Sequence, residues 1–206
     1  MSSPACPYCG VVLNRAPTRR ARCVDCGDPI LVRKGRLCTE DEARAIDVCT
    51  RVAVPLDRLW EARELLSAKW GHRAKAADAA WGILNQLVVT TADFHGRGMV
   101  YFQMARFLWE EGRDHLEVAR QSRQMELANW KQAEDRGFLD LSRARVAVIT
   151  AKDASCPECR ALEGVEFTYG EAVEKMPIPV IGCTHDLSPG RTHGWCRCCY
   201  GLNFVR

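Results

Sequence analysis

Residues 6–27 read CPYCGVVLNRAPTRRARCVDCG, and this stretch determines how the N-terminal part of the chain folds. It holds two Cys-x-x-Cys units, each followed by glycine, with thirteen residues between Cys9 and Cys23. Two residues between cysteines let one tight turn direct both thiolates at one ion, and glycine tolerates the positive φ with which the chain leaves that turn. The spacing therefore predicts a zinc ribbon over residues 1–36, with four ligands: Cys6, Cys9, Cys23 and Cys26.

The predicted zinc site is structural. Four thiolates complete a tetrahedral site and leave no open position for a catalytic water. A module this short buries too little apolar surface to fold alone, so metal binding would supply the missing free energy. The alternative for a Cys-x-x-Cys unit is a redox motif, which requires one exposed pair beside a strand and a helix start. Two matched pairs favour zinc.

The N-terminal module is also the basic part of the chain. Residues 1–36 contain seven Lys or Arg and two Asp, a net charge of +5, whereas the whole chain has a net charge of +3. The loop between the cysteine pairs holds four candidates for phosphate contacts: Arg15, Arg19, Arg20 and Arg22. No aromatic stacking pattern accompanies them. We therefore favour a protein-contact or purely structural ribbon and keep nucleic-acid binding as the alternative.

The composition predicts a folded protein outside the membrane. Of its 206 residues, 47% are hydrophobic and 27% charged, a profile typical of a packed core. No window offers the eighteen or so apolar residues of a membrane span, and the N-terminus lacks the features of a signal peptide. We expect a cytoplasmic protein, or a virion-associated one if a phage encodes it. In a reducing compartment its twelve cysteines favour metal ligation over disulfides.

The middle of the chain, residues 37–137, is predicted to be a helical domain. Thr39–Glu42 has the form of a capping box, and breaks are expected at Pro55, at Gly71 and at His95–Gly98. Four helices follow from these signals, at residues 39–53, 56–70, 73–93 and 97–134. Apolar residues recur in them at helical spacing. We expect three tryptophans to anchor the core: Trp81, Trp109 and Trp130.

Residues 138–206 are predicted to form a second zinc-binding module. The run RARVAVIT at residues 143–150 indicates a strand, and it leads to six cysteines between residues 156 and 199. Cys156-x-x-Cys159 is another knuckle, whose partners must come from Cys183 or from residues 193–198. The predicted ligands are Cys156, Cys159, Cys183 and Cys196. The alternatives are His193 and Cys198.

Together these signals predict a mainly α protein with small zinc-bound β modules and two structural Zn²⁺ ions. The N-terminal ribbon and the central helical region would be followed by a small α+β module at the C-terminus. We expect the two zinc modules to serve structure rather than catalysis.

The C-terminal region resembles phage Mu F-type head-morphogenesis proteins. The resemblance covers about the last sixty-five residues and consists of a strand, an Asp, CPxC, ALxG, a Phe-Thr pair, prolines and H-x-x-C-R-C. The matching positions are Asp153, Cys156, Cys159, Ala161–Gly164, Phe167, Pro177, Pro179, His193, Cys196, Arg197 and Cys198. The resemblance implies a role in phage head assembly, with a portal or capsid protein as partner, and it transfers no catalytic residue. Residues 180–192 and the N-terminal ribbon lie outside the family's pattern.

Two enzyme classes remain as weaker alternatives. A zinc deaminase would use His115 and Glu117 with Cys156 and Cys159, but Ser155 stands where that motif has proline. A zinc-supported nuclease would use His185 and Asp186, whose order is reversed from the nuclease motif. Without a phosphate-binding glycine loop or a nucleophile elbow, we expect no enzyme. The sequence predicts a zinc-stabilised structural or interaction protein, with a nucleic-acid-binding zinc ribbon as the alternative function.

Overall fold

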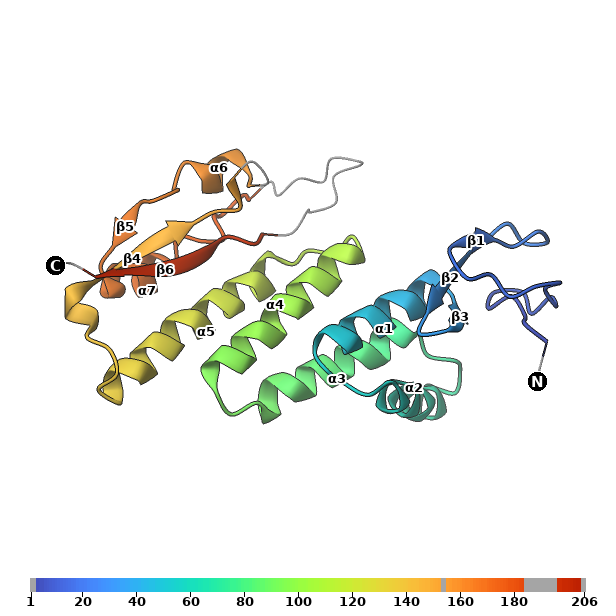
Figure 1. Ribbon diagram of the computed structural model, residues 1–206. Helices are drawn as coiled ribbons and strands as arrows, with labels where there is room; N and C mark the ends of the chain where they lie inside the picture. Colours follow the sequence, from blue (N-terminus) through green and yellow to red (C-terminus); the bar gives the residue numbers. More distant parts are fainter. Residues whose placement is uncertain (1–2, 153–154, 184–195, 205–206) are drawn as a thin grey trace. The chain divides into compact units, whose positions relative to one another are not determined.

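The computed structural model describes residues 3–152, 155–183 and 196–204 (Figure 1). The chain is mainly α-helical with small antiparallel sheets, as the sequence predicts. It divides into two compact units, Met1–Gln86 and Leu87–Arg206, and the boundary falls inside one helix. The predicted modules at residues 1–36, 37–137 and 138–206 stay a prediction. None of the described helices is both long and apolar enough to cross a membrane.

The first unit begins with a small sheet beside the two cysteine turns. Strands β1 (Ala21–Arg22), β2 (Pro29–Arg33) and β3 (Arg36–Cys38) pair antiparallel in that order (Figure 1). The β2–β3 turn has positive φ at Lys34 and Gly35, as a tight hairpin requires. Ile30 is fully buried between Cys6 and Cys23, with apolar side chains around them. This core is too small to stabilise the ribbon alone.

Three helices complete the first unit: α1 (Glu40–Arg51), α2 (Leu56–Trp70) and α3 (Ala76–Thr90), the last of which continues into the second unit. The predicted capping box is present at α1, where Thr39 Oγ1 accepts from Glu42 N–H at 3.1 Å and Glu42 Oε2 accepts from Thr39 N–H at 3.2 Å. Asp41, on the same turn, accepts from the N–H groups of Ala76 and Ala77 at 2.7 and 3.1 Å. One turn of α1 therefore satisfies donors at two helix starts.

The second unit contains a helical hairpin of α4 (Phe94–Glu110) and α5 (Leu116–Asp135) (Figure 1). The two helices approach closely at Gly98, where an added Cβ would lie 3.1 Å from Met125 Cβ. At the same crossing Ser122 Oγ donates to Gly98 O at 2.9 Å. An added Cβ would have to displace Met125 by a few tenths of an ångström, so glycine permits the close approach of the two helices.

The C-terminal sheet follows the hairpin. Its central strand β4 (Ala144–Ile149) pairs antiparallel with β5 (Glu166–Phe167) and β6 (Cys199–Phe204). A 3₁₀ turn, η1 (Leu141–Arg143), precedes β4, and the short helices α6 (Pro157–Arg160) and α7 (Tyr169–Lys175) lie between the strands in sequence. The core joins Leu127 of α5 to Val146 and Val148 of β4, together with buried cysteines. The strand predicted at residues 143–150 is confirmed.

Two details of the helical prediction are wrong. The expected helix 97–134 is two helices, because the chain turns at Gly112, where φ is +69°. The expected break at His95–Gly98 lies inside α4, because Asp93 caps that helix by accepting from Gly96 N–H at 2.6 Å. Gly96 and Gly98 therefore do not mark a helix boundary, whereas Gly112 does.

The prediction that tryptophans anchor the core is supported at Trp130, which packs against the C-terminal core. Trp81, Trp109 and Trp130 are each partly buried. The large side chains that are fully buried in the helices are aliphatic or phenyl: Ile46, Leu59, Leu84 and Phe107. An indole is large and carries an N–H that favours a position near the surface.

Candidate metal centres

The two N-terminal knuckles have the same backbone structure. Cys6 N–H donates to Val11 O at 2.9 Å and Gly10 N–H donates to Cys6 O at 2.9 Å. In the second knuckle Cys23 N–H donates to Asp28 O at 3.0 Å and Gly27 N–H donates to Cys23 O at 3.0 Å. Both glycines have φ near +76°, which only glycine adopts without strain. The repeated Cys-x-x-Cys-Gly sequence therefore forms a repeated turn, as predicted.

The four thiols of these turns converge on one point. Their sulfur atoms all lie within 4.8 Å of one another. Cys6 and Cys26 are 3.8 Å apart at Sγ, and so are Cys9 and Cys23. Zinc–sulfur bonds of about 2.3 Å at tetrahedral angles place two sulfurs about 3.8 Å apart. The N-terminal group has the geometry of a site that could hold a metal ion.

Each knuckle supplies one buried and one exposed thiol. Cys6 and Cys23 are buried against Ile30, whereas Cys9 and Cys26 are exposed. Both close pairs join a buried thiol of one knuckle to an exposed thiol of the other. A bound ion would thus link the small core of the ribbon to its surface, where solvent could reach it.

The thiols of the ribbon differ in acidity. Burial opposes ionisation of Cys6, but backbone hydrogen bonds from Cys9 and Tyr8 and contacts with the Cys23 and Cys9 thiols lower its pKa to about 7. A backbone hydrogen bond at Asp28 favours the Cys26 thiolate, but desolvation and the Cys23 and Cys9 thiols outweigh it and raise the pKa of Cys26 to about 12. One thiolate therefore forms readily, and further protons would leave as a metal binds.

The C-terminal cysteines form two groups that share Cys159. One group is Cys156, Cys159 and Cys183, and the other is Cys159, Cys196 and Cys198. Within each group the sulfur atoms lie within 4.8 Å of one another, and Cys156 and Cys183 approach to 3.5 Å. Cys196 and Cys198 face the same side of the chain, as expected for an extended segment. This cluster too could hold a metal ion.

Local structure positions the C-terminal thiols inside the core. Cys156 is the N-cap of α6, and its sulfur accepts from Cys159 N–H at 3.4 Å. Cys156, Cys159, Cys196 and Cys198 are all buried, and they pack with Val146, Val148 and Ile178. The Cys183 thiol opposes ionisation of Cys159, but those of Cys196 and Cys198 outweigh it and lower the pKa of Cys159 to about 7. Cys159 thus belongs to both groups and has an acidic thiol.

The predicted ligand set at the C-terminus stays a prediction. The structure brings Cys156, Cys159, Cys183 and Cys196 into the same cluster. It adds Cys198, which the spacing predicts only as an alternative ligand. His193, the other alternative, lies outside the described residues. Spacing alone could not separate Cys196 from Cys198, because both stand on one side of a short extended segment.

The four loop arginines are exposed, but they are not equivalent. Arg22 donates to Gly27 O at 3.0 Å and so braces the second knuckle, while Arg20 lies 3.6 Å from the Glu40 carboxylate. Arg15 and Arg19 form no ion pair with any residue that the structure describes. These two are the arginines of the ribbon most available to a partner.

The two enzyme alternatives differ in how much of each candidate site the structure describes. His115 is buried at the N-cap of α5, which corrects the expectation that it lies within a helix, and Glu117 follows in the first turn. Neither belongs to a potential metal-binding group among the described residues. His185 and Asp186 lie outside the described residues. Asp153, which is part of the family resemblance, also lies outside the described residues.

No protein-family model, curated protein or solved structure matches the chain.

Proposed function

We propose that the protein is a zinc-stabilised interaction protein whose N-terminal ribbon and C-terminal module each hold one structural Zn²⁺. The observation that supports this best is the convergence of Cys6, Cys9, Cys23 and Cys26, with two sulfur pairs at 3.8 Å. Soft thiolates in a tetrahedral arrangement select zinc among the common divalent ions. Four thiolates fill its coordination sphere, so this ion would stabilise the fold and would not activate water.

The C-terminal cluster supports the same role by its position. Its cysteines belong to the core that holds α5, α7 and the sheet of β4 and β6 together. Zinc bound there would join Cys156 and Cys159, on the turn after β4, to Cys196, just before β6. An ion in that place crosslinks segments that are distant in sequence, as a structural zinc does.

The experiment is a count of zinc per chain in single-cysteine variants. Cys23→Ser and Cys159→Ser should each lose one of two zinc ions, because each removes a ligand from a different cluster. Cys49→Ala is the matched control, since Cys49 is buried in α1 and belongs to neither cluster. It should keep both ions. Retention of both ions by either serine variant would overturn the assignment.

The more specific role that we propose is that of a phage head-assembly factor that contacts a portal or capsid protein. Its support is the resemblance of the C-terminal residues to Mu F-type head-morphogenesis proteins. This role predicts that the gene lies beside portal, capsid or terminase genes in a phage or prophage. A locus among unrelated host genes would contradict the role in head assembly but leave the zinc sites unaffected.

A further inference from the structure

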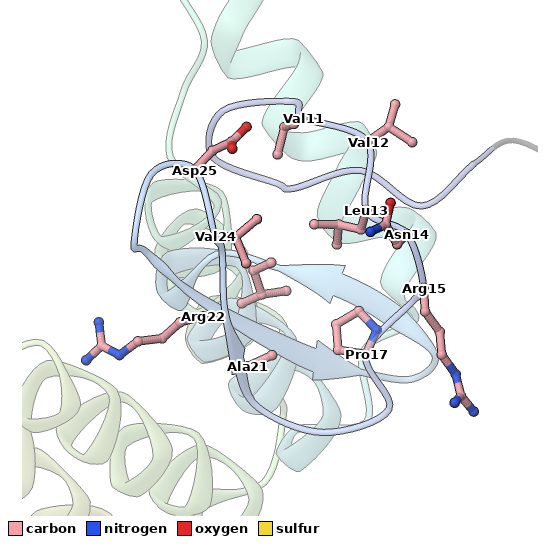
Figure 2. A pocket seen from close by; sticks show the side chains of 11 residues that line it. Val11, Val12, Leu13, Asn14, Arg15, Pro17, Ala21, Arg22, Val24 and Asp25 are labelled. Carbon is pink, nitrogen blue, oxygen red and sulfur yellow. The ribbon is translucent and has the colours of Figure 1, made fainter.

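The zinc ribbon contains an apolar groove that the metal site does not use. It has a volume of about 350 Å³ and lies between the chain after the first knuckle and the second knuckle (Figure 2). Figure 2 shows Val11, Leu13 and Val24 directed toward its middle, and buried Ile30 also lines it. This volume is at the lower end of the range of about 300–1,000 Å³ that is typical of ligand pockets. It suits one or two apolar side chains better than a large cofactor.

The groove keeps apolar surface exposed in a small, strongly basic module. Val24 is 92% exposed and Val12 is 64% exposed, and both line it. A single exposed valine has no special meaning, since soluble proteins expose many. Here two of them border one hollow, on a ribbon with a net charge of +5 over residues 1–36. Together they form a small apolar surface that a partner could cover.

Two arginines flank the groove on opposite sides. Figure 2 shows Arg15 and Arg22 extending outward from opposite sides of it. Arg22 uses one donor on Gly27 O, which leaves further guanidinium donors for a ligand. An occupant that presents apolar side chains at its centre and carboxylates at its ends would match both features.

The same surface is less suited to nucleic acid. Among the described residues no aromatic side chain lines the groove, so bases would find no ring there on which to stack. The outer edge of β1, which lines the groove through Ala21 and Arg22, has no strand partner in the described sheet. An extended peptide could pair with such an edge.

We propose that this groove binds an extended protein segment in which apolar side chains are flanked by Asp or Glu. The proposal rests on the proposed function, because it names the partner class of the zinc ribbon. Val11 and Leu13 form the floor with Ile30, Val24 is the exposed wall, and Arg15 and Arg22 bind the acidic flanks.

The test is selection from a displayed library of random short peptides on the full chain, with counter-selection on Val24→Asp. We expect enriched peptides with acidic residues on both sides of an apolar centre. Their affinity should fall by roughly tenfold or more in Val24→Asp. A bound peptide would cover the new carboxylate with its apolar centre, and the carboxylate would repel the acidic flanks of the peptide. Val89→Asp is the matched control, since Val89 is an exposed valine of α3 and lies outside the groove, and it should leave affinity unchanged.

Three outcomes would overturn the proposal. The first is that no enriched peptide distinguishes the chain from Val24→Asp, and the second is that the enriched peptides lack acidic flanks. The third is that a labelled oligothymidylate binds more tightly than any selected peptide. Loss of this binding in Arg15→Glu, together with its retention in Val24→Asp, would identify a nucleic-acid surface. Zinc per chain is measured on every variant. Unchanged zinc with failed peptide binding contradicts the groove alone, whereas an absence of zinc in the unmodified chain contradicts the proposed function.

Discussion

At the scale of single residues, Asp41 and Glu42 have separate structural roles although they are neighbours. Asp41 accepts from the first amides of α3, whereas Glu42 accepts from Arg63 Nη1 at 2.8 Å. The side chains of Glu42 and Arg63 are only 11% and 15% exposed. A mostly buried carboxylate requires such a partner. Two adjacent acidic residues thereby tie α1 to α2 and to the start of α3.

We predict that Asp41→Ala will destabilise the start of α3 by about 1 kcal/mol, the usual cost of losing a helix cap. Hydrogen exchange at Ala76 and Ala77 would measure it, because these amides lose their acceptor. The matched control is Asp78→Ala, which removes the same charge from the first turn of α3. Equal exchange in the two variants would mean that charge at the helix end, rather than the hydrogen bonds, stabilises this turn.

At the scale of elements, the close contact of α4 and α5 depends on the absence of a side chain at Gly98. Leucine there would have to displace Met125, whose Cβ is 3.1 Å from the position of an added Cβ. Gly82, in α3, has open space around it and allows a direct comparison. The two helical glycines should therefore respond in opposite directions to the same substitution.

We predict that Gly98→Leu will destabilise the α4–α5 hairpin by about 1–3 kcal/mol through overpacking. Gly82→Leu should stabilise α3 by about 0.5–1 kcal/mol, because leucine is the better helix former. Hydrogen exchange resolved by helix would measure both effects. Protection of α4 and α5 that is unchanged in Gly98→Leu would show that the crossing is looser than described.

The elements differ in how far the sequence could predict them. Cys6-x-x-Cys9-Gly10 specifies its turn locally, because spacing and glycine chemistry together leave little choice. Thr39 and Glu42 likewise predict their capping box. The α4 start was missed because Asp93 as an N-cap outweighs the glycines that follow it, and the tight crossing at Gly98 is a tertiary feature without a local signal. The choice between Cys196 and Cys198 has no local signal either, because both thiols face the same side of one short segment.

At the scale of the whole molecule, the two cysteine clusters differ in their exposure to solvent. The ribbon has two exposed thiols, Cys9 and Cys26, and only a small core behind its site. The C-terminal cluster has four buried cysteines within a larger core of β-strand and helix residues. Metal binding should therefore couple to folding at both ends of the chain. The zinc ions of the two sites should leave at different rates.

We predict that a zinc chelator will remove metal from the ribbon before it removes metal from the C-terminal module. Release should be biphasic in the unmodified chain when followed with a colorimetric zinc indicator. Cys23→Ser should lack the fast phase, and Cys159→Ser should lack the slow one. The reverse assignment of phases would contradict the difference in exposure on which this prediction depends.

Both proposed zinc sites, one toward each end of the chain, are closed and all-thiolate. Zinc K-edge X-ray absorption on the full chain, purified without chelator, measures their ligands directly. Two such sites should give a first coordination shell of four sulfur atoms per zinc at about 2.3 Å. One or more nitrogen or oxygen ligands per zinc at about 2.0–2.1 Å would contradict it, because a lighter ligand would mean a different donor set or an open position.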